Sequence, residues 1–187
     1  GKVRDKITLT DRLRPYITDN DKTPVWDGKV LLYKKSKHKS SNKYLLGSVE
    51  VQIKGKENSN LFKSSISYSI EVNDLNIYIN NGGVIFFVVY IDKNNPDLRK
   101  IYYETLPPVK IKRYLKGKET QQTVTIKLGE LPDSNKHIES IFFNFYNNKN
   151  KQYSFKDRPL ISWEDISKRK DIKSVKCEDV KYSSDSE

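Results

Sequence analysis

The chain is poor in the residues that build cysteine- and histidine-based sites. Its 187 residues contain one cysteine, Cys177, and two histidines, His38 and His137. A lone cysteine forms no intramolecular disulfide and no cysteine-rich zinc site, and it fits a reducing compartment. Neither histidine has partners at the spacing that a zinc site or a catalytic triad requires. These absences exclude the disulfide-stabilised secreted class and the common zinc enzymes.

Long apolar runs are also missing. The longest, residues 84–91, has the length of a strand, whereas a membrane-spanning helix needs about 20 apolar residues. No secretory signal is present. We therefore expect a cytoplasmic protein that has no membrane partner.

Acidic residues are outnumbered by basic ones. Asp and Glu number 24 against 35 Lys and Arg, which gives a formal net charge of +11. Only 35% of the residues are hydrophobic, but the aromatic share of 11%, with 12 Tyr and 7 Phe, is too high for a disordered chain. A folded, basic chain predicts a polyanionic partner, with nucleic acid first among the candidates.

Methionine is absent, so we expect that the natural start is not included and that the chain is one domain of a longer protein. Gly1 would then be a residue left by tag removal. The length suits a single domain with a modest appendage. We assign residues 1–155 to this domain and residues 156–187, which end in serine and charged residues, to a C-terminal extension or linker to a missing region.

The hydrophobic patterns alternate between strands and helices. A loosely periodic segment predicts a short helix within residues 7–18, which Pro15 would end early. Strands are predicted over residues 30–33, 44–54, 65–72, 84–91, 101–104 and 123–128, and further helices over residues 73–80, 109–116 and 135–148. The continuous apolar strand suits the centre of a sheet that is covered on both faces. We therefore predict an α/β fold with a central mixed β-sheet flanked by helices; a nucleic-acid-binding β-barrel is the alternative.

One group of polar residues could carry chemistry. In a strand, Glu50, Gln52 and Lys54 share one face, which taken alone fits the solvent side of an edge strand. Asp27 changes that reading. If the two strands form a hairpin around the lysine-rich loop, paired positions sum to about 77, and Asp27 lies opposite residue 50, one pleat from Gln52. An acid, an amide oxygen and a lysine would then converge at one end of the hairpin.

These residue types suit phosphodiester hydrolysis. Asp27 and Gln52 offer hard oxygen ligands to Mg²⁺ or Mn²⁺. The cation would activate a water and neutralise charge on a scissile phosphate. Lys54 would orient the nucleophile or stabilise the transition state.

Asp27 followed by the strand Gln52-x-Lys54 resembles the PD-(D/E)xK nuclease superfamily, in the Mrr-like branch where Gln replaces the second acid. The surrounding sequence resembles the N-terminal nuclease-like domains of bacterial anti-phage defence proteins. The resemblance extends over roughly residues 20–116 and is carried by residues 20–28, 51–55, 82–89 and 101–103.

The resemblance implies a restriction-endonuclease-like fold and metal-dependent cleavage of double-stranded DNA. It also implies a homo-oligomer, fused to a sensor or ATPase region in the full-length chain. Family members often carry a further acid on an N-terminal helix. Asp11 is the only acid in the predicted helical segment, and Glu50 could compensate by facing the same site as Gln52. The alternative is a catalytically degenerate nuclease-fold module that binds nucleic acid or mediates assembly.

Basic residues gather in three segments, the last of them at residues 168–173. Such segments are often solvated surface, and an acidic protein is a further possible partner. As DNA contacts they would be independent of sequence and sensitive to salt. Trp26 is predicted to be a packing anchor for the hairpin. The candidate DNA-binding residues in the first two segments are Lys34, Lys35, Lys37, Lys39, Lys43, Lys112, Arg113 and Lys116.

Overall fold

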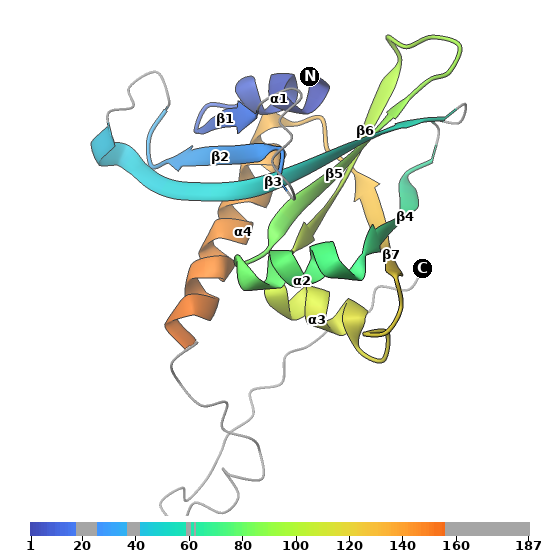
Figure 1. Ribbon diagram of the computed structural model, residues 1–187. Helices are drawn as coiled ribbons and strands as arrows, with labels where there is room; N and C mark the ends of the chain where they lie inside the picture. Colours follow the sequence, from blue (N-terminus) through green and yellow to red (C-terminus); the bar gives the residue numbers. More distant parts are fainter. Residues whose placement is uncertain (18–25, 37–41, 59–60, 62, 156–187) are drawn as a thin grey trace, which may run out of the picture. The chain divides into compact units, whose positions relative to one another are not determined.

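A computed structural model describes residues 1–17, 26–36, 42–58, 61 and 63–155. Contacts divide the chain into a compact unit, Gly1–Gln152, and a second unit, Tyr153–Glu187, and the account below concerns the first. In chain order (Figure 1) the elements are α1 (Lys2–Thr8), β1 (Leu13–Ile17), β2 (Gly28–Tyr33), the 3-10 helix η2 (Asn42–Tyr44), β3 (Leu45–Glu57), β4 (Ser65–Glu71), α2 (Val72–Asn80), β5 (Val84–Ile91), β6 (Arg99–Leu106), α3 (Pro108–Leu115), β7 (Thr123–Glu130) and α4 (Asn135–Phe155). Within the described ranges, no helix is long and apolar enough to cross a membrane.

The strands form one seven-stranded sheet in the order β1-β2-β3-β5-β6-β7-β4. The β3–β5 pair is parallel, and the other neighbouring strands are antiparallel. Helix α2 lies on the connection that returns the chain to a strand parallel to β3, as such crossovers require. The predicted α/β fold with a central mixed sheet flanked by helices is confirmed. The β-barrel alternative is wrong, because β1 and β4 form two open edges.

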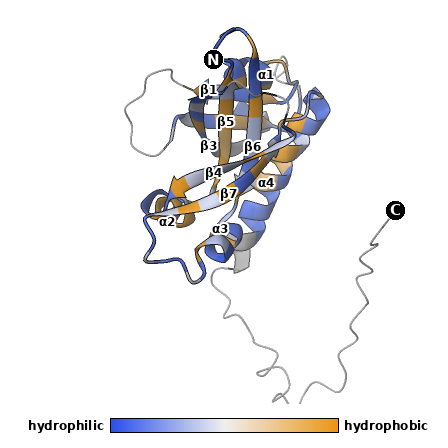
Figure 2. Ribbon diagram, turned by 90° about the vertical axis from the view of Figure 1, so that its right-hand side faces the viewer, coloured by the Kyte–Doolittle hydropathy of each residue, from blue (hydrophilic) through white to orange (hydrophobic). Residues whose placement is uncertain are grey.

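Strand β5 supplies the centre of both cores. Its side chains alternate, with Ile85 and Phe87 in one cluster and Val84 and Phe86 in the other. The first cluster contains residues from α1 and α4, and the second contains residues from α2 and α3. In Figure 2 hydrophobic colour concentrates on the strands, while much of α4 is hydrophilic. The sheet is therefore covered by helices on both faces, as the apolar run 84–91 predicted.

The predicted helix over residues 7–18 is wrong. Helix α1 ends at Thr8, and residues 13–17 form strand β1 instead. Leu13 and Ile17 are buried on the same side of this strand, so spacing that resembled a loose helical period is strand alternation. Pro15 is tolerated because β1 lies at the sheet edge, where a missing N–H leaves no interior ladder bond unmade.

The hairpin register differs from the predicted one by two residues. Gly28 pairs with Val51, so the continuation of this ladder places Asp27 level with Gln52 rather than with Glu50. A bulge at the other end of the hairpin, where the register shifts between Leu32 and Tyr33, accounts for one of these two residues. The other arises beside the turn, where Tyr33 pairs with Leu45 rather than with Tyr44.

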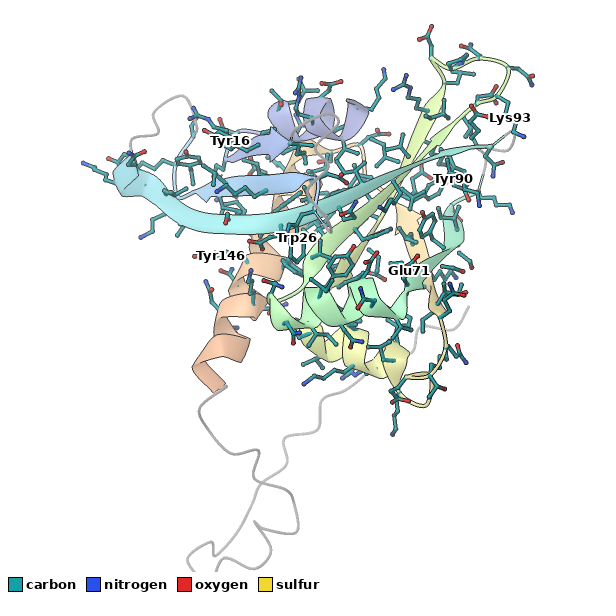
Figure 3. The ribbon with its side chains drawn as sticks, viewed as in Figure 1. Tyr16, Trp26, Glu71, Tyr90, Lys93 and Tyr146 are labelled. Atoms are coloured by element: carbon teal, nitrogen blue, oxygen red, sulfur yellow. The ribbon has the colours of Figure 1, made fainter. Side chains whose placement is uncertain are left out.

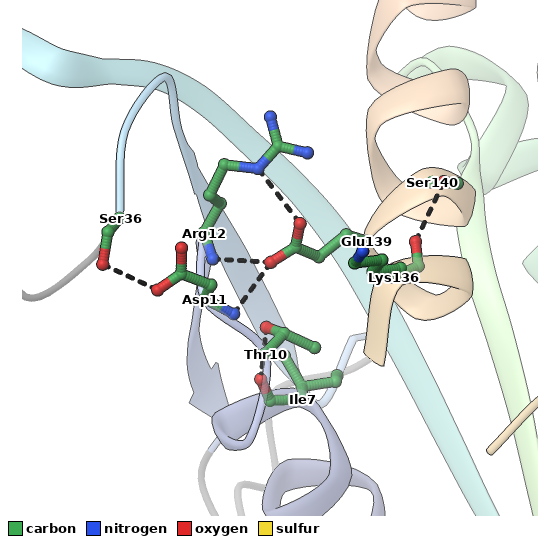
Figure 4. A network of polar contacts seen from close by, with 8 residues as sticks. All are labelled: Ile7, Thr10, Asp11, Arg12, Ser36, Lys136, Glu139 and Ser140. Carbon is green, nitrogen blue, oxygen red and sulfur yellow. Dashed lines mark hydrogen bonds and ion pairs between the residues drawn. The ribbon is translucent and has the colours of Figure 1, made fainter. Parts of the chain in front are cut away.

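A buried carboxylate ties α4 to the start of β1 (Figure 4). Glu139 Oε1 accepts hydrogen bonds from the backbone N–H groups of Asp11 and Arg12, both at 2.8 Å. Glu139 Oε2 accepts from Arg12 Nε at 3.0 Å, and the Arg12 guanidinium lies 4.3 Å from the centre of the Phe143 ring. The Glu139 side chain is 10% exposed, so these bonds replace nearly all of its hydration.

We expect Glu139→Ala to lower the free energy of unfolding by about 2–3 kcal/mol, because two backbone N–H groups and the Arg12 charge lose their buried partner. Urea denaturation measures this difference. Glu130→Ala is the matched control. Its carboxylate pairs with Lys100 but is 45% exposed, and its loss should cost less than about 1 kcal/mol. Equal losses in the two variants would contradict the structural role of Glu139.

Candidate active site

Asp27 directly precedes β2, at the end of the hairpin where β3 extends past the first residue of β2. Its N–H donates to Val51 O at 3.1 Å, and its carboxylate Oδ2 accepts from Ile53 N at 2.6 Å. The carboxylate thus occupies the edge of β3 that β2 no longer covers. Gln52 Nε2 donates to the same oxygen at 2.6 Å, while Oδ1 accepts no hydrogen bond from the described residues. The predicted meeting of Asp27 and Gln52 is present.

Neighbouring residues hold Asp27 in place on both sides. Trp26 packs against the cluster formed with α2, with its ring centre 5.5 Å from that of Tyr78, and Figure 3 places it between β3 and α2. The prediction of Trp26 as a packing anchor is confirmed. On the other side, Gly28 has φ +152° and packs against the backbone of Tyr16.

The side-chain amide of Gln52 has a buried oxygen without a hydrogen-bond partner among the described residues. The residue is 4% exposed, and its Oε1 is the one buried side-chain polar atom among the described residues that has no partner. A buried acceptor without a partner costs about 1–3 kcal/mol. Next to it, Asp27 supplies a carboxylate, and carboxylate and amide oxygens are ligands that Mg²⁺ accepts. These two side chains therefore fit a divalent cation.

Lys54 lies on the same face of β3 as Gln52, two residues further along, at the position paired with Val88 of β5. It is partly exposed, and none of the described acids forms an ion pair with it. Its ammonium group is thus on the same side of the sheet as the unpartnered oxygen of Gln52.

Tyr78 of α2 borders this face of the sheet. Burial raises the pKa of its hydroxyl far above the usual range, and the negative charges of Asp74 and Asp27 raise it further. The ring is 1% exposed. Tyr78 therefore contributes a neutral, apolar wall rather than an ionisable group.

The two other predicted acids are placed elsewhere. Glu50 pairs in register with Lys29, and its Oε2 accepts from Lys149 of α4 at 2.9 Å. Asp11 lies before β1, at the end of that strand remote from the Ile17–Gly28 pair, and it accepts from Ser36 Oγ at 2.6 Å. The described residues contain no group of three or more His, Cys, Asp or Glu that could hold a metal ion.

The predicted DNA-binding residues lie away from Asp27. Lys34, Lys35 and Lys43 are exposed beside the hairpin turn, at the opposite end of β2, and the last two stack on the Tyr44 ring at 4.7 and 5.0 Å. The exposed Lys112 and Arg113 belong to α3, and Lys116 follows it. Residues Lys37 and Lys39, and the segment 168–173, lie outside the described residues.

Sequence reasoning missed the pocket that opens on Asp27. The pocket has a volume of about 220 Å³, with Asp27, Ile17, Ile53, Gly55, Val89 and Ile91 among its lining residues. Its basic lining residues are Lys2, Arg4 and Arg99, which come from α1 and β6. No local pattern joins these positions, because they are brought together only by the sheet.

The structure thus brings together the Asp27 carboxylate, a buried amide oxygen that has no partner among the described residues, and a lysine on the same face as that oxygen. A basic pocket opens on the other face of the sheet and is also lined by Asp27. This donor set suits a cation bound beside an anionic ligand. Comparison of the chain with protein-family models, with curated proteins and with solved structures finds no match.

Proposed function

We propose that the chain is a Mg²⁺- or Mn²⁺-dependent DNA endonuclease domain of a bacterial anti-phage defence protein. The observation that carries the proposal is the hydrogen bond between Gln52 and Asp27, together with a buried Gln52 Oε1 that has no partner among the described residues. The proposal extends to a cytoplasmic protein that acts as a homo-oligomer and has a sensor or ATPase region elsewhere in its full-length chain. Its substrate is double-stranded DNA.

Each residue has a separate role in this proposal. Asp27 and Gln52 hold the cation, which when bound supplies water activation and charge neutralisation at the phosphate. Lys54 places a positive charge where negative charge develops in the transition state. Trp26 and Gly28 keep the Asp27 carboxylate at the edge of β3.

Lys54→Ala tests the lysine's part in cleavage. We expect the rate of nicking of a supercoiled plasmid in Mg²⁺ to fall about 10²- to 10³-fold, as when one preorganised electrostatic group is removed from an active site. Lys56→Ala is the control, because it removes the same charge from the next exposed position on that face of β3. Cleavage by the wild type that persists in EDTA, or equal losses in both variants, would refute the assignment.

A degenerate module that binds nucleic acid without cutting it is the second candidate. It is favoured by the hydrogen bond from Gln52 Nε2 to Asp27, which gives the carboxylate a partner without a cation. It is also favoured because the described residues contain no group of three or more His, Cys, Asp or Glu that could hold a metal ion. This candidate predicts salt-dependent DNA binding of the same strength in EDTA and in Mg²⁺, together with no cleavage in either. Gel-shift titration in the two buffers separates the candidates.

A further inference from the structure

The pocket beside Asp27 combines two kinds of lining. Its floor is aliphatic and consists of Ile17, Ile53, Val89 and Ile91, which belong to or pack against the cluster on the α1 and α4 face of the sheet. Lys2 and Arg99 are exposed basic lining residues. Asp27 is the one acid among the lining residues. An apolar floor with a basic rim matches a ligand that has an apolar ring and an anionic group.

The volume limits how much of a ligand can enter. At about 220 Å³ the pocket is smaller than the roughly 300–1,000 Å³ of sites that enclose a whole small molecule. One unit of a longer ligand fits such a space, while the remainder stays outside. A nucleotide of a DNA strand is a unit of this type, with a flat base that packs on apolar side chains and a phosphate that pairs with Lys and Arg.

The position of the pocket relates it to the candidate metal ligands. Gln52 and Lys54 face the α2 side of the sheet, whereas the pocket lies on the α1 side. Asp27 sits at the edge of β3 between them, beyond the last residue of β2 that pairs with this edge in the described part of the chain. A DNA strand crossing this edge would have one phosphate near Asp27 and its neighbouring nucleotide over the pocket.

We infer that this pocket binds an unpaired nucleotide next to the phosphate that is cleaved, with Lys2 and Arg99 on its phosphate and the four aliphatic residues under its base. The inference rests on the proposed function for the identity of the ligand, DNA. Arg99 Nε donates to Pro96 O at 2.9 Å, which orients the guanidinium at the pocket. The domain therefore prefers DNA whose end or junction exposes an unstacked base, because unstacking a paired base costs a few kcal/mol.

Binding without cleavage tests the inference. Fluorescence anisotropy in EDTA compares a blunt duplex with the same duplex bearing a single-stranded overhang. We expect the wild type to bind the overhang probe more tightly. Gly55→Leu fills the pocket without a change of charge, and a Cβ at Gly55 meets only Ile91 Cδ1, at 4.0 Å. We expect this variant to lose the preference and to bind the overhang probe about tenfold more weakly.

Two further variants separate the possible causes. Arg99→Glu should weaken binding of the overhang probe about tenfold, and Lys112→Glu on α3, the same charge change outside the pocket, less than about threefold. Lys54→Ala, on the other face of the sheet and outside the pocket, should lose cleavage and keep the preference for the overhang probe. Failure of the candidate active site and failure of the pocket therefore give different results. Thermal unfolding establishes that each variant is folded. Equal affinity of the wild type for the two probes, an unchanged preference in folded Gly55→Leu, or equal losses in Arg99→Glu and Lys112→Glu would overturn the inference.

Discussion

Asp27→Asn should abolish metal-dependent cleavage, lowering the rate of plasmid nicking by about a thousandfold or more. The substitution keeps the size of the side chain but removes the carboxylate that accepts the hydrogen bond from Gln52 Nε2. It also places an amide where Oδ2 now accepts from Ile53 N and Gln52 Nε2. Loss of a metal's anionic ligand removes several kcal/mol of transition-state stabilisation, and each 1.36 kcal/mol is tenfold in rate.

Asp11→Asn is the matched control for this change. Asp11 is exposed and accepts from Ser36 Oγ, and it lies at the end of β1 remote from Asp27. We expect its cleavage rate to stay within about twofold of the wild type, as for a surface substitution away from the chemistry. Cleavage by Asp27→Asn at the wild-type rate would remove Asp27 from the site.

Gly28→Ala should lower the free energy of unfolding by about 3 kcal/mol or more. A Cβ at this position would lie 2.2 Å from Tyr16 O and 2.8 Å from Ile17 Cα, and both are backbone atoms that cannot turn aside. The φ of +152° adds strain for any residue with a side chain. Separation of β1 from β2 would relieve the clash and would also displace Asp27. Because about 1 kcal/mol shifts the melting temperature of a chain of this size by roughly 2–4 °C, we expect a decrease of about 6–12 °C in a thermal melt.

Gly129→Ala provides the comparison within the same sheet. Gly129 lies in β7, and a Cβ there meets no atom within 4 Å. Its substitution should be neutral or stabilise the fold by a few tenths of a kcal/mol, since alanine has less freedom in the unfolded chain. A melting temperature of Gly28→Ala equal to that of Gly129→Ala would contradict the described approach of β1 to Gly28.

The elements that the sequence predicted well have strong local patterns. The apolar run 84–91 is strand β5, and the periodic segment 135–148 lies within α4, which continues to Phe155. The order of strands depends on contacts far apart in the chain and was not predicted. Strand β4 pairs with β7, about 60 residues later in the chain. The sequence of neither strand indicates which strand it pairs with. Strand β1 was predicted to be part of a helix because the spacing of its apolar residues resembles a loose helical period, whereas burial at Leu13 and Ile17 follows strand alternation.

The candidate site was predicted in part for a physical reason. Hairpin partners are close in sequence, so the distance of each residue from the turn predicts that Asp27 and Gln52 lie near each other. The predicted register is wrong by two residues, one of which is caused by the bulge near Leu32. The hairpin pattern does not indicate that Glu50 binds Lys149 of α4, because the two residues lie 99 positions apart in the sequence. The basic pocket was not predicted for the same reason, because its lining residues Lys2 and Arg99 lie far apart in the sequence.

The most direct measurement is crystallographic, with Mn²⁺ soaked into crystals of the wild-type chain and located by its anomalous scattering. We predict one strong peak bonded to an Asp27 carboxylate oxygen and to Gln52 Oε1, with the Gln52 amide turned from its hydrogen bond to Asp27. The peak should be absent from Asp27→Asn crystals soaked in the same way. No peak at Asp27 in wild-type crystals at saturating Mn²⁺, with Gln52 Nε2 still bonded to Asp27 Oδ2, would contradict the metal site.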